Sequence, residues 1–304
     1  HFVTGGFSGG ATQVAVQLVR AARDSDAIEP LLVLRRKRQT PAARLEELQR
    51  DGVPMAVVPG WSHAATILAL VRLCLQFRPD VLVEMGMPPE RTVAIPNGIR
   101  LEPFTEADAH PWRDRVPGIV MVARFSKQKD HATLLHALAL LRQRGLRVPL
   151  QLAGGGKDLH RAPLERLAGQ LGVADQVEFP GVVRDVPQRL MQHQVCVLST
   201  HYEGMPLALL EGMAAGCAVV GSAVPGVREV IEDGVNGVLV PESDPEALAS
   251  ALEDLLRDSS RAAALAARAR RTALEHHSRE RMHRDYEALF VELARQPPRT
   301  RDSA

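Results

Sequence analysis

Hydrophobic positions from residue 118 onward alternate between short apolar runs and amphipathic segments. The apolar runs are rich in β-branched residues and predict strands at 118–123, 148–154, 176–181, 195–200, 217–222 and 237–241. Helical periodicity fills the intervals, as at 131–144 and 164–172. Continuous apolar strands alternating with helices are typical of a parallel, doubly wound sheet. Ligands of such sheets bind outside the carboxyl ends of the strands.

The segment after this repeat, 244–296, predicts successive helices. Asp244 followed by Pro245 is a start signal, because an N-cap acid and a proline at the first helical position both suit a helix N-terminus.

The first hundred residues carry a shorter version of the same pattern. An opening strand leads through a glycine-rich turn into a helix, and further elements are expected as strands at 28–34, 53–59 and 80–86 and helices at 43–52 and 65–77. A second Rossmann-like domain would need two or three more βα units, about 60–80 residues, before "GMPPERTVAIPNGI" begins. We therefore expect an incomplete N-terminal domain with a segment missing near 86/87. The fold class is α/β.

Composition adds few restrictions. With 304 residues, 45% hydrophobic and 24% charged, the chain is long enough for two domains, and a net charge of +1 gives no global attraction to nucleic acid. Cys74, Cys196 and Cys217 are odd in number and lie in apolar settings, which predicts free thiols in a cytoplasmic protein. The apolar run 67–77 is interrupted by Arg72 and is too short to span a bilayer.

Two glutamates stand out in "HYEGMPLALLEGMAAGCAVV" (201–220). Glu203 and Glu211 have seven residues between them and apolar neighbours on both sides. An ionised carboxylate in such surroundings needs a partner, because desolvation costs several kcal/mol or shifts its pKa. We expect Glu203 at the carboxyl end of a strand, and Glu211 two turns into a helix that begins near Met205, so that both project towards one ridge.

The start of that helix can also hold an anion. The backbone N–H groups of Gly204, Met205 and Leu207 are expected to face the ligand, as helix N-termini do for diphosphates. The alternative is structural: Glu203 caps the helix and Glu211 pairs with a surface arginine.

A second cluster lies in "VARFSKQKD" (122–130). Arg124 and Lys129 stand five apart in a loop after a predicted strand. Two cations at this edge suit a diphosphate, with the arginine as a fork and the lysine as a point charge. The alternative is a solvated basic turn, which is the interpretation we give Lys127.

These segments carry a family resemblance. "RFSKQK" followed by "EGMPLALLE", with "IPNGI" before and "EDGVNGVLVP" after, resembles the retaining glycosyltransferases of family 4 (GT4) over most of 86–295. That resemblance implies the GT-B fold, in which two Rossmann-like domains face each other across a cleft. It implies an acceptor-side domain at 1–98, joined by a C-terminal helix near 279–296, and a donor-binding domain at 99–278.

The resemblance also implies roles for residues. Arg124 and Lys129 would bind the diphosphate of a nucleotide sugar, and Glu203 would contact the transferred sugar; these three form the expected catalytic set. Glu211 would bind the ribose hydroxyls.

Three backbone turns complete the implied donor site. "FPGVVRD" (179–185) resembles the family's base-binding turn, so the backbone at Val182 or Val183 should meet the nucleobase. Gly154, in "LAGGGKD", would let the sheet edge lie close to the nucleotide. Gly10, in "GGFSGGATQV", would approach the diphosphate from the acceptor domain, because only a residue without Cβ lets the backbone come that close.

The implied reaction moves a sugar, with retention, from a nucleotide diphosphate sugar to a hydroxyl of a glycan or lipid-linked acceptor in polysaccharide or glycolipid biosynthesis. A UDP-sugar is the expected donor, and neither metal nor cofactor is expected. The family's acceptor-domain histidine is expected in the missing segment and is assigned to no residue. Two alternatives stay open, a nucleotide-sugar epimerase of similar shape and a non-catalytic nucleotide-sugar binding protein.

A basic run, "LRRKRQ" (34–39), follows a predicted strand in the N-terminal half. Arg35, Arg36, Lys37 and Arg38 could face anionic lipid at the inner face of the plasma membrane or an acceptor's phosphates. A solvated turn is the alternative.

Overall fold

The computed structural model describes residues 1–4, 10–23, 25–36, 40–77, 93, 95–156 and 158–295. The chain divides into two compact units. His1–Ile95 with Glu280–Ala304 forms unit 1, and Pro96–Arg279 forms unit 2.

Unit 2 is built on a six-stranded parallel sheet in the order β6-β5-β4-β7-β8-β9. Its strands are β4 (Val116–Val122), β5 (Leu150–Ala153), β6 (Val177–Gly181), β7 (His193–Leu198), β8 (Ala218–Ser222) and β9 (Val238–Val240). Each lies within two residues of a predicted run, which confirms the prediction of a parallel sheet. The order reverses direction between β4 and β7, and such a switch point is where doubly wound sheets open a ligand crevice.

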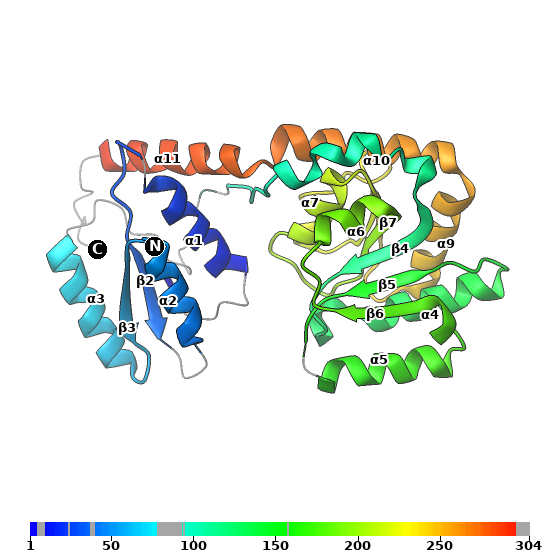
Figure 1. The fold of residues 1–304 in the computed structure, drawn as a ribbon, viewed down its shortest axis with the longest axis horizontal. Helices are drawn as coiled ribbons and strands as arrows, with labels where there is room; N and C mark the ends of the chain where they lie inside the picture. The colour runs from blue at the N-terminus through cyan, green and yellow to red at the C-terminus, as the bar shows by residue number, and fades with distance from the viewer. Residues whose placement is uncertain are drawn as a thin grey trace, which may run out of the picture. The chain divides into compact units, whose positions relative to one another are not determined.

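Helices cover both faces of this sheet (Figure 1). They are α4 (His131–Gln143), α5 (Asp158–Gln170), α6 (Val186–Gln192), α7 (Leu207–Ala214), α8 (Pro225–Arg228), α9 (Pro245–Arg257) and α10 (Ser259–His276), with 3₁₀ turns η2 (Glu102–Ala109), η3 (Trp112–Asp114), η4 (Lys127–Lys129) and η5 (Ala174–Gln176). The start signal at Asp244 is confirmed, because its side chain accepts a hydrogen bond from the Ala247 N–H at 2.9 Å. The helix predicted at 164–172 begins earlier, at Asp158, and tolerates Pro163 within it.

The core of unit 2 explains why its strands lack polar alternation. Ile119, Val120 and Met121 in β4 are fully buried, because helices cover the sheet on both sides. Cys196 and Cys217 are buried free thiols, as predicted. Cys74 is also a free thiol but is only half-buried.

Unit 1 contains a parallel sheet of β1 (Phe2–Thr4), β2 (Leu32–Arg36) and β3 (Met55–Pro59), in that order. Its helices are α1 (Gly10–Ala22), α2 (Ala42–Arg50), α3 (His63–Phe77) and, from Glu280 onward, α11 (Arg279–Arg295). The strand predicted at 28–34 was placed too early. The strand predicted at 80–86 and the expected gap near 86/87 lie outside the described residues. Within the described ranges, no helix is long and apolar enough to cross a membrane.

Candidate functional site

Two loops meet at the switch point of the unit 2 sheet. One follows β4 and carries Lys129, and the other follows β7 and carries Glu203. Their side chains form an ion pair between Lys129 Nζ and Glu203 Oε1, although the residues are 74 positions apart. The side chains are only 16% and 9% exposed, so the pair is shielded from solvent. The structure thus brings together two of the three residues predicted as the catalytic set.

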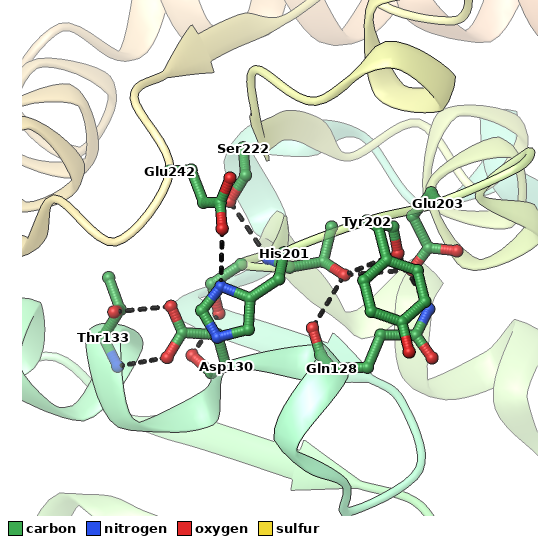
Figure 2. A network of polar contacts seen from close by, with 10 residues as sticks. Gln128, Asp130, Thr133, His201, Tyr202, Glu203, Ser222 and Glu242 are labelled. Carbon is green, nitrogen blue, oxygen red and sulfur yellow. Dashed lines mark hydrogen bonds and ion pairs between the residues drawn. The ribbon is translucent and has the colours of Figure 1, made fainter.

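Gln128 fastens the two loops to each other. Its carbonyl oxygen accepts the His201 N–H at 2.9 Å, and its side-chain Nε2 donates to the Tyr202 carbonyl at 2.8 Å (Figure 2). Ser199 Oγ adds a bond of 3.0 Å to the Asp130 carbonyl. The loops therefore form one hydrogen-bonded platform, which fixes Lys129 opposite Glu203.

Asp130 makes the turn that ends the first loop. Its backbone is left-handed, with φ of 39°, and its carboxylate accepts hydrogen bonds from Thr133 Oγ1 at 2.7 Å and the Thr133 N–H at 3.4 Å. This capping begins α4 directly after Lys129 and compensates the strained backbone.

Arg124 is the third member of the predicted catalytic set. It follows β4, is exposed, and forms no hydrogen bond or ion pair with any described residue. Its guanidinium is therefore available to an anionic ligand, and its role in diphosphate binding stays a prediction.

The helix behind Glu203 begins later than predicted. α7 starts at Leu207, two residues after Met205, because a residue before proline is disfavoured from the helical conformation and Pro206 occupies the N-cap. Glu203 therefore precedes the helix, as expected, and the projection of both glutamates towards one ridge stays a prediction. The alternative that Glu203 caps the helix is wrong, since no side chain caps it.

The backbone before α7 offers two N–H groups. In the described part of the chain, those of Gly204 and Met205 donate to no backbone carbonyl, whereas that of Leu207 donates to the Met205 carbonyl at 3.1 Å. Gly204 and Met205 thus remain candidates for holding an anion, and Leu207 is already engaged. A Cβ on Gly226, at the start of α8, would lie 2.3 Å from the Glu203 and Gly204 carbonyl oxygens, so glycine there keeps this turn in place.

Glu211 lies in the first turns of α7. Burial raises the pKa of its carboxyl to about 7, and the positive charge of Arg100 opposes that shift. The carboxylate accepts no hydrogen bond and forms no ion pair among the described residues, so the alternative of a surface arginine partner is not observed. Glu211 is therefore a half-buried acceptor that can still accept hydrogen bonds, as expected of a group that binds ribose hydroxyls. Its binding of ribose stays a prediction.

The glycine turn after β5 lies beside the loop of Arg124. A Cβ on Gly154 would stand 1.9 Å from the Ala123 carbonyl oxygen, and the Phe125 N–H donates to the Gly155 carbonyl at 2.8 Å. Gly154 is therefore required by the close approach of the chain's own backbone. Its predicted approach to a nucleotide is a separate hypothesis.

The remaining predicted residues are Val182, Val183 and Gly10. Val182 is 77% exposed after β6, and Val183 is half-buried. In unit 1, Gly10 is the first residue of α1. No described contact tests their predicted roles.

Arg35 and Arg36 belong to strand β2, whereas Lys37 and Arg38 lie outside the described residues. The expectation that the basic run follows the strand was wrong for its first two members. Successive side chains of a strand point to opposite faces, so Arg35 and Arg36 do not form one basic surface.

His131 is a buried group that sequence reasoning missed. It is the first residue of α4, is 2% exposed, and packs against Phe125 with ring centroids 5.0 Å apart. Burial, assisted by the charge of Lys129, lowers the pKa of His131 to about 4, so the ring is neutral at neutral pH. Across the described ranges, no group of three His, Cys, Asp or Glu side chains is placed to hold a metal.

Known proteins resemble the chain both in sequence and in structure. The family model for Glycosyl transferases group 1 matches residues 104–272. D-inositol 3-phosphate glycosyltransferase of Geodermatophilus obscurus is 35% identical over 204 residues, covering 62% of this chain and 44% of that protein. A GDP-mannose-dependent phosphatidylinositol monomannoside mannosyltransferase of Mycolicibacterium smegmatis is 33% identical over 171 residues, covering 52% and 44%. The chain therefore spans less than half the length of these relatives.

Solved structures agree on the architecture. HepE of Anabaena, solved with UDP-glucose, superposes with a TM-score of 0.76 at 17% identity, covering 96% of this chain and 98% of that one. This similarity confirms the predicted α/β GT-B fold with parallel sheets.

Proposed function

The chain belongs to the Glycosyl transferases group 1 family, and from that premise we propose that it transfers a sugar from a nucleotide diphosphate sugar to a hydroxyl of a glycan or lipid-linked acceptor, with retention of configuration. The observation that carries the proposal is the shielded pair of Lys129 and Glu203 at the sheet's switch point. A cation for the diphosphate and a carboxylate for the sugar stand side by side where such a sheet receives its ligand.

The chemistry follows from these positions. As the glycosidic bond breaks, negative charge grows on the leaving diphosphate. Arg124, Lys129 and the N–H groups of Gly204 and Met205 stabilise that charge, and Lys129 is held in place before the reaction begins by its ion pair with Glu203. Glu203 orients the sugar through its hydroxyls. The incoming hydroxyl attacks on the face from which the diphosphate departs, so no carboxylate serves as a nucleophile.

A UDP-sugar is the proposed donor. Support comes from the fold shared with HepE, whose structure contains UDP-glucose. The relative named for GDP-mannose makes a guanosine donor the competing choice. Glu211 receives the ribose hydroxyls in either case, because every nucleoside diphosphate presents the same ribose to the half-buried carboxylate.

A second candidate is nucleotide-sugar binding without transfer. It is favoured by one observation, that Arg124, Lys129, Glu203 and Glu211 all lie in unit 2. A donor site contained in one unit can bind a nucleotide sugar whether or not an acceptor is served. Contact between the basic run at Arg35 and an anionic membrane stays a prediction.

A turnover assay separates the two candidates. The full chain is incubated with UDP-glucose or GDP-mannose and with phosphatidylinositol vesicles or D-inositol 3-phosphate, and release of the nucleoside diphosphate is followed. Release that depends on acceptor and is lost in Glu203→Ala supports transfer, and NMR of the product should show the donor's anomeric configuration. Donor binding without release under every combination supports the second candidate.

A further inference from the structure

Thr200 lies between the two loops of the site. It follows β7, is 0% exposed, and its backbone N–H donates to Ser222 Oγ at 3.0 Å. Its side-chain hydroxyl lies within hydrogen-bonding distance of the Glu203 carboxylate. No sequence motif singled this residue out.

The hydroxyl of Thr200 carries one proton and has three acceptor oxygens within hydrogen-bonding distance. Its Oγ1 lies 3.0 Å from the Gln128 carbonyl oxygen, 3.2 Å from Glu203 Oε1 and 3.3 Å from the Tyr202 carbonyl oxygen. A threonine hydroxyl donates one hydrogen bond at a time, so it serves one of these three oxygens and can turn to another.

Both carbonyl oxygens keep a donor without Thr200. The Gln128 carbonyl accepts the His201 N–H at 2.9 Å, and the Tyr202 carbonyl accepts Gln128 Nε2 at 2.8 Å. Turning the Thr200 proton to Glu203 therefore leaves neither buried carbonyl unpaired, and the cost of an orphaned acceptor is avoided.

Glu203 is the acceptor whose other partner can leave. In this structure its Oε1 is paired with Lys129 Nζ. A diphosphate beside Lys129 and Arg124 competes for that ammonium group, because it carries more negative charge than one carboxylate. A shielded carboxylate that loses its cation needs another donor.

Resting on the proposed function, we propose that Thr200 is a positioning residue for Glu203. When the donor's diphosphate draws Lys129 away, the Thr200 hydroxyl donates to the Glu203 carboxylate and keeps it directed at the transferred sugar. Lys129 holds Glu203 before the donor binds, and Thr200 holds it afterwards.

The test compares the affinity of each variant for the nucleotide sugar with its affinity for the free nucleotide. Dissociation constants are measured by calorimetry for UDP and UDP-glucose and for GDP and GDP-mannose, and the pair that the unmodified chain binds is used. Thr200→Val removes the hydroxyl and keeps the shape, whereas Thr200→Ser keeps the hydroxyl. We expect Thr200→Val to weaken binding of the nucleotide sugar roughly fivefold to thirtyfold and binding of the free nucleotide by a clearly smaller factor, because both ligands draw Lys129 away but only the nucleotide sugar also contacts Glu203. Thr200→Ser should stay near the unmodified chain for both.

A second background shows whether Thr200 acts through Glu203. In Glu203→Ala, adding Thr200→Val should cause no further loss of nucleotide-sugar affinity, because the group to be positioned is gone. Equal weakening of both ligands, or the same loss in the Glu203→Ala background, would overturn the inference while leaving the proposed function intact. Failure of both Thr200→Val and Thr200→Ala to fold would make the hydroxyl structural and also overturn it. Failure of the unmodified chain to bind either pair would contradict the proposed function as well.

Discussion

Replacing Glu211 with glutamine should stabilise the protein, and more so at alkaline pH. In the folded chain the pKa of this carboxyl is raised from 4.5 to about 7 by burial. A folded-state pKa above the unfolded value means that the folded chain holds more protons between those two values. Stability therefore falls as pH rises from about 4.5 to about 7, and this contribution is lost above pH 7.

The size of the effect follows from the shift. A difference of about 2.5 pKa units corresponds to about 3 kcal/mol of stability that is present below pH 4.5 and absent above pH 7. Glutamine does not titrate, so Glu211→Gln should gain about 2.5 kcal/mol more at pH 8 than at pH 5. For a unit of this size, that gain raises the melting temperature by roughly 5–10 °C.

Thermal unfolding at pH 5, 6, 7 and 8 measures the gain. Glu203→Gln is the matched control, because the carboxylate it removes is paired with Lys129 rather than unpaired. That control should lose stability at pH 8, since it leaves a shielded ammonium group without its partner. A gain for Glu211→Gln that is equal at pH 5 and pH 8, or no gain at either, would refute the argument that a buried charge is responsible.

Three further predictions concern the same unit. Glu211→Ala should weaken the binding of UDP and of UDP-glucose alike, whereas Glu203→Ala should weaken the binding of UDP-glucose and leave that of UDP nearly unchanged. Each loss should be ~1–3 kcal/mol of binding free energy in calorimetry. Equal losses for both ligands in both variants would contradict this division. Gly154→Ala should destabilise the chain by ~2 kcal/mol or more in denaturant unfolding, because its Cβ has no room. The control Gly169→Ala, in open space on α5, should be neutral or stabilise by ~0.5–1 kcal/mol, and similar losses in both would argue against steric exclusion. His131, whose folded pKa of about 4 lies below 6.5, supports stability that is lost as pH falls through this interval. Between pH 6.5 and pH 4, the free energy of unfolding of His131→Leu should therefore fall by up to about 3 kcal/mol less than that of the unmodified chain. Denaturant unfolding at several pH values measures this, and parallel pH profiles of stability for the two proteins would rule it out.

The sheet of unit 2 was predictable because its strands are buried on both faces. Runs such as 118–123 and 217–222 carry a local signal that needs no knowledge of their neighbours. The strand predicted at 28–34 failed on a local detail. Pro30 lacks a backbone N–H, so the ladder begins after it, at Leu32, and then continues through two arginines that hydrophobicity alone would exclude.

The site was predictable only where residue type and spacing carry the chemistry. Lys129 was identified because two cations at a strand's carboxyl end suit a diphosphate, and Glu203 because a carboxylate among apolar neighbours needs a partner. Thr200 and Gln128 were missed, because their roles arise from hydrogen bonds between loops more than 70 residues apart. No periodicity along the chain reports such contacts. The start of α7 lies two residues after the predicted Met205, because Pro206 disfavours the helical conformation at Met205.

Donor binding by unit 2 is the central claim, and calorimetric titration with UDP, GDP and ADP in the absence of acceptor tests it most directly. We predict selective binding of one nucleoside diphosphate by the unmodified chain, and loss of that binding in Lys129→Ala. Absence of binding to all three, or binding that Lys129→Ala leaves unchanged, would contradict the claim.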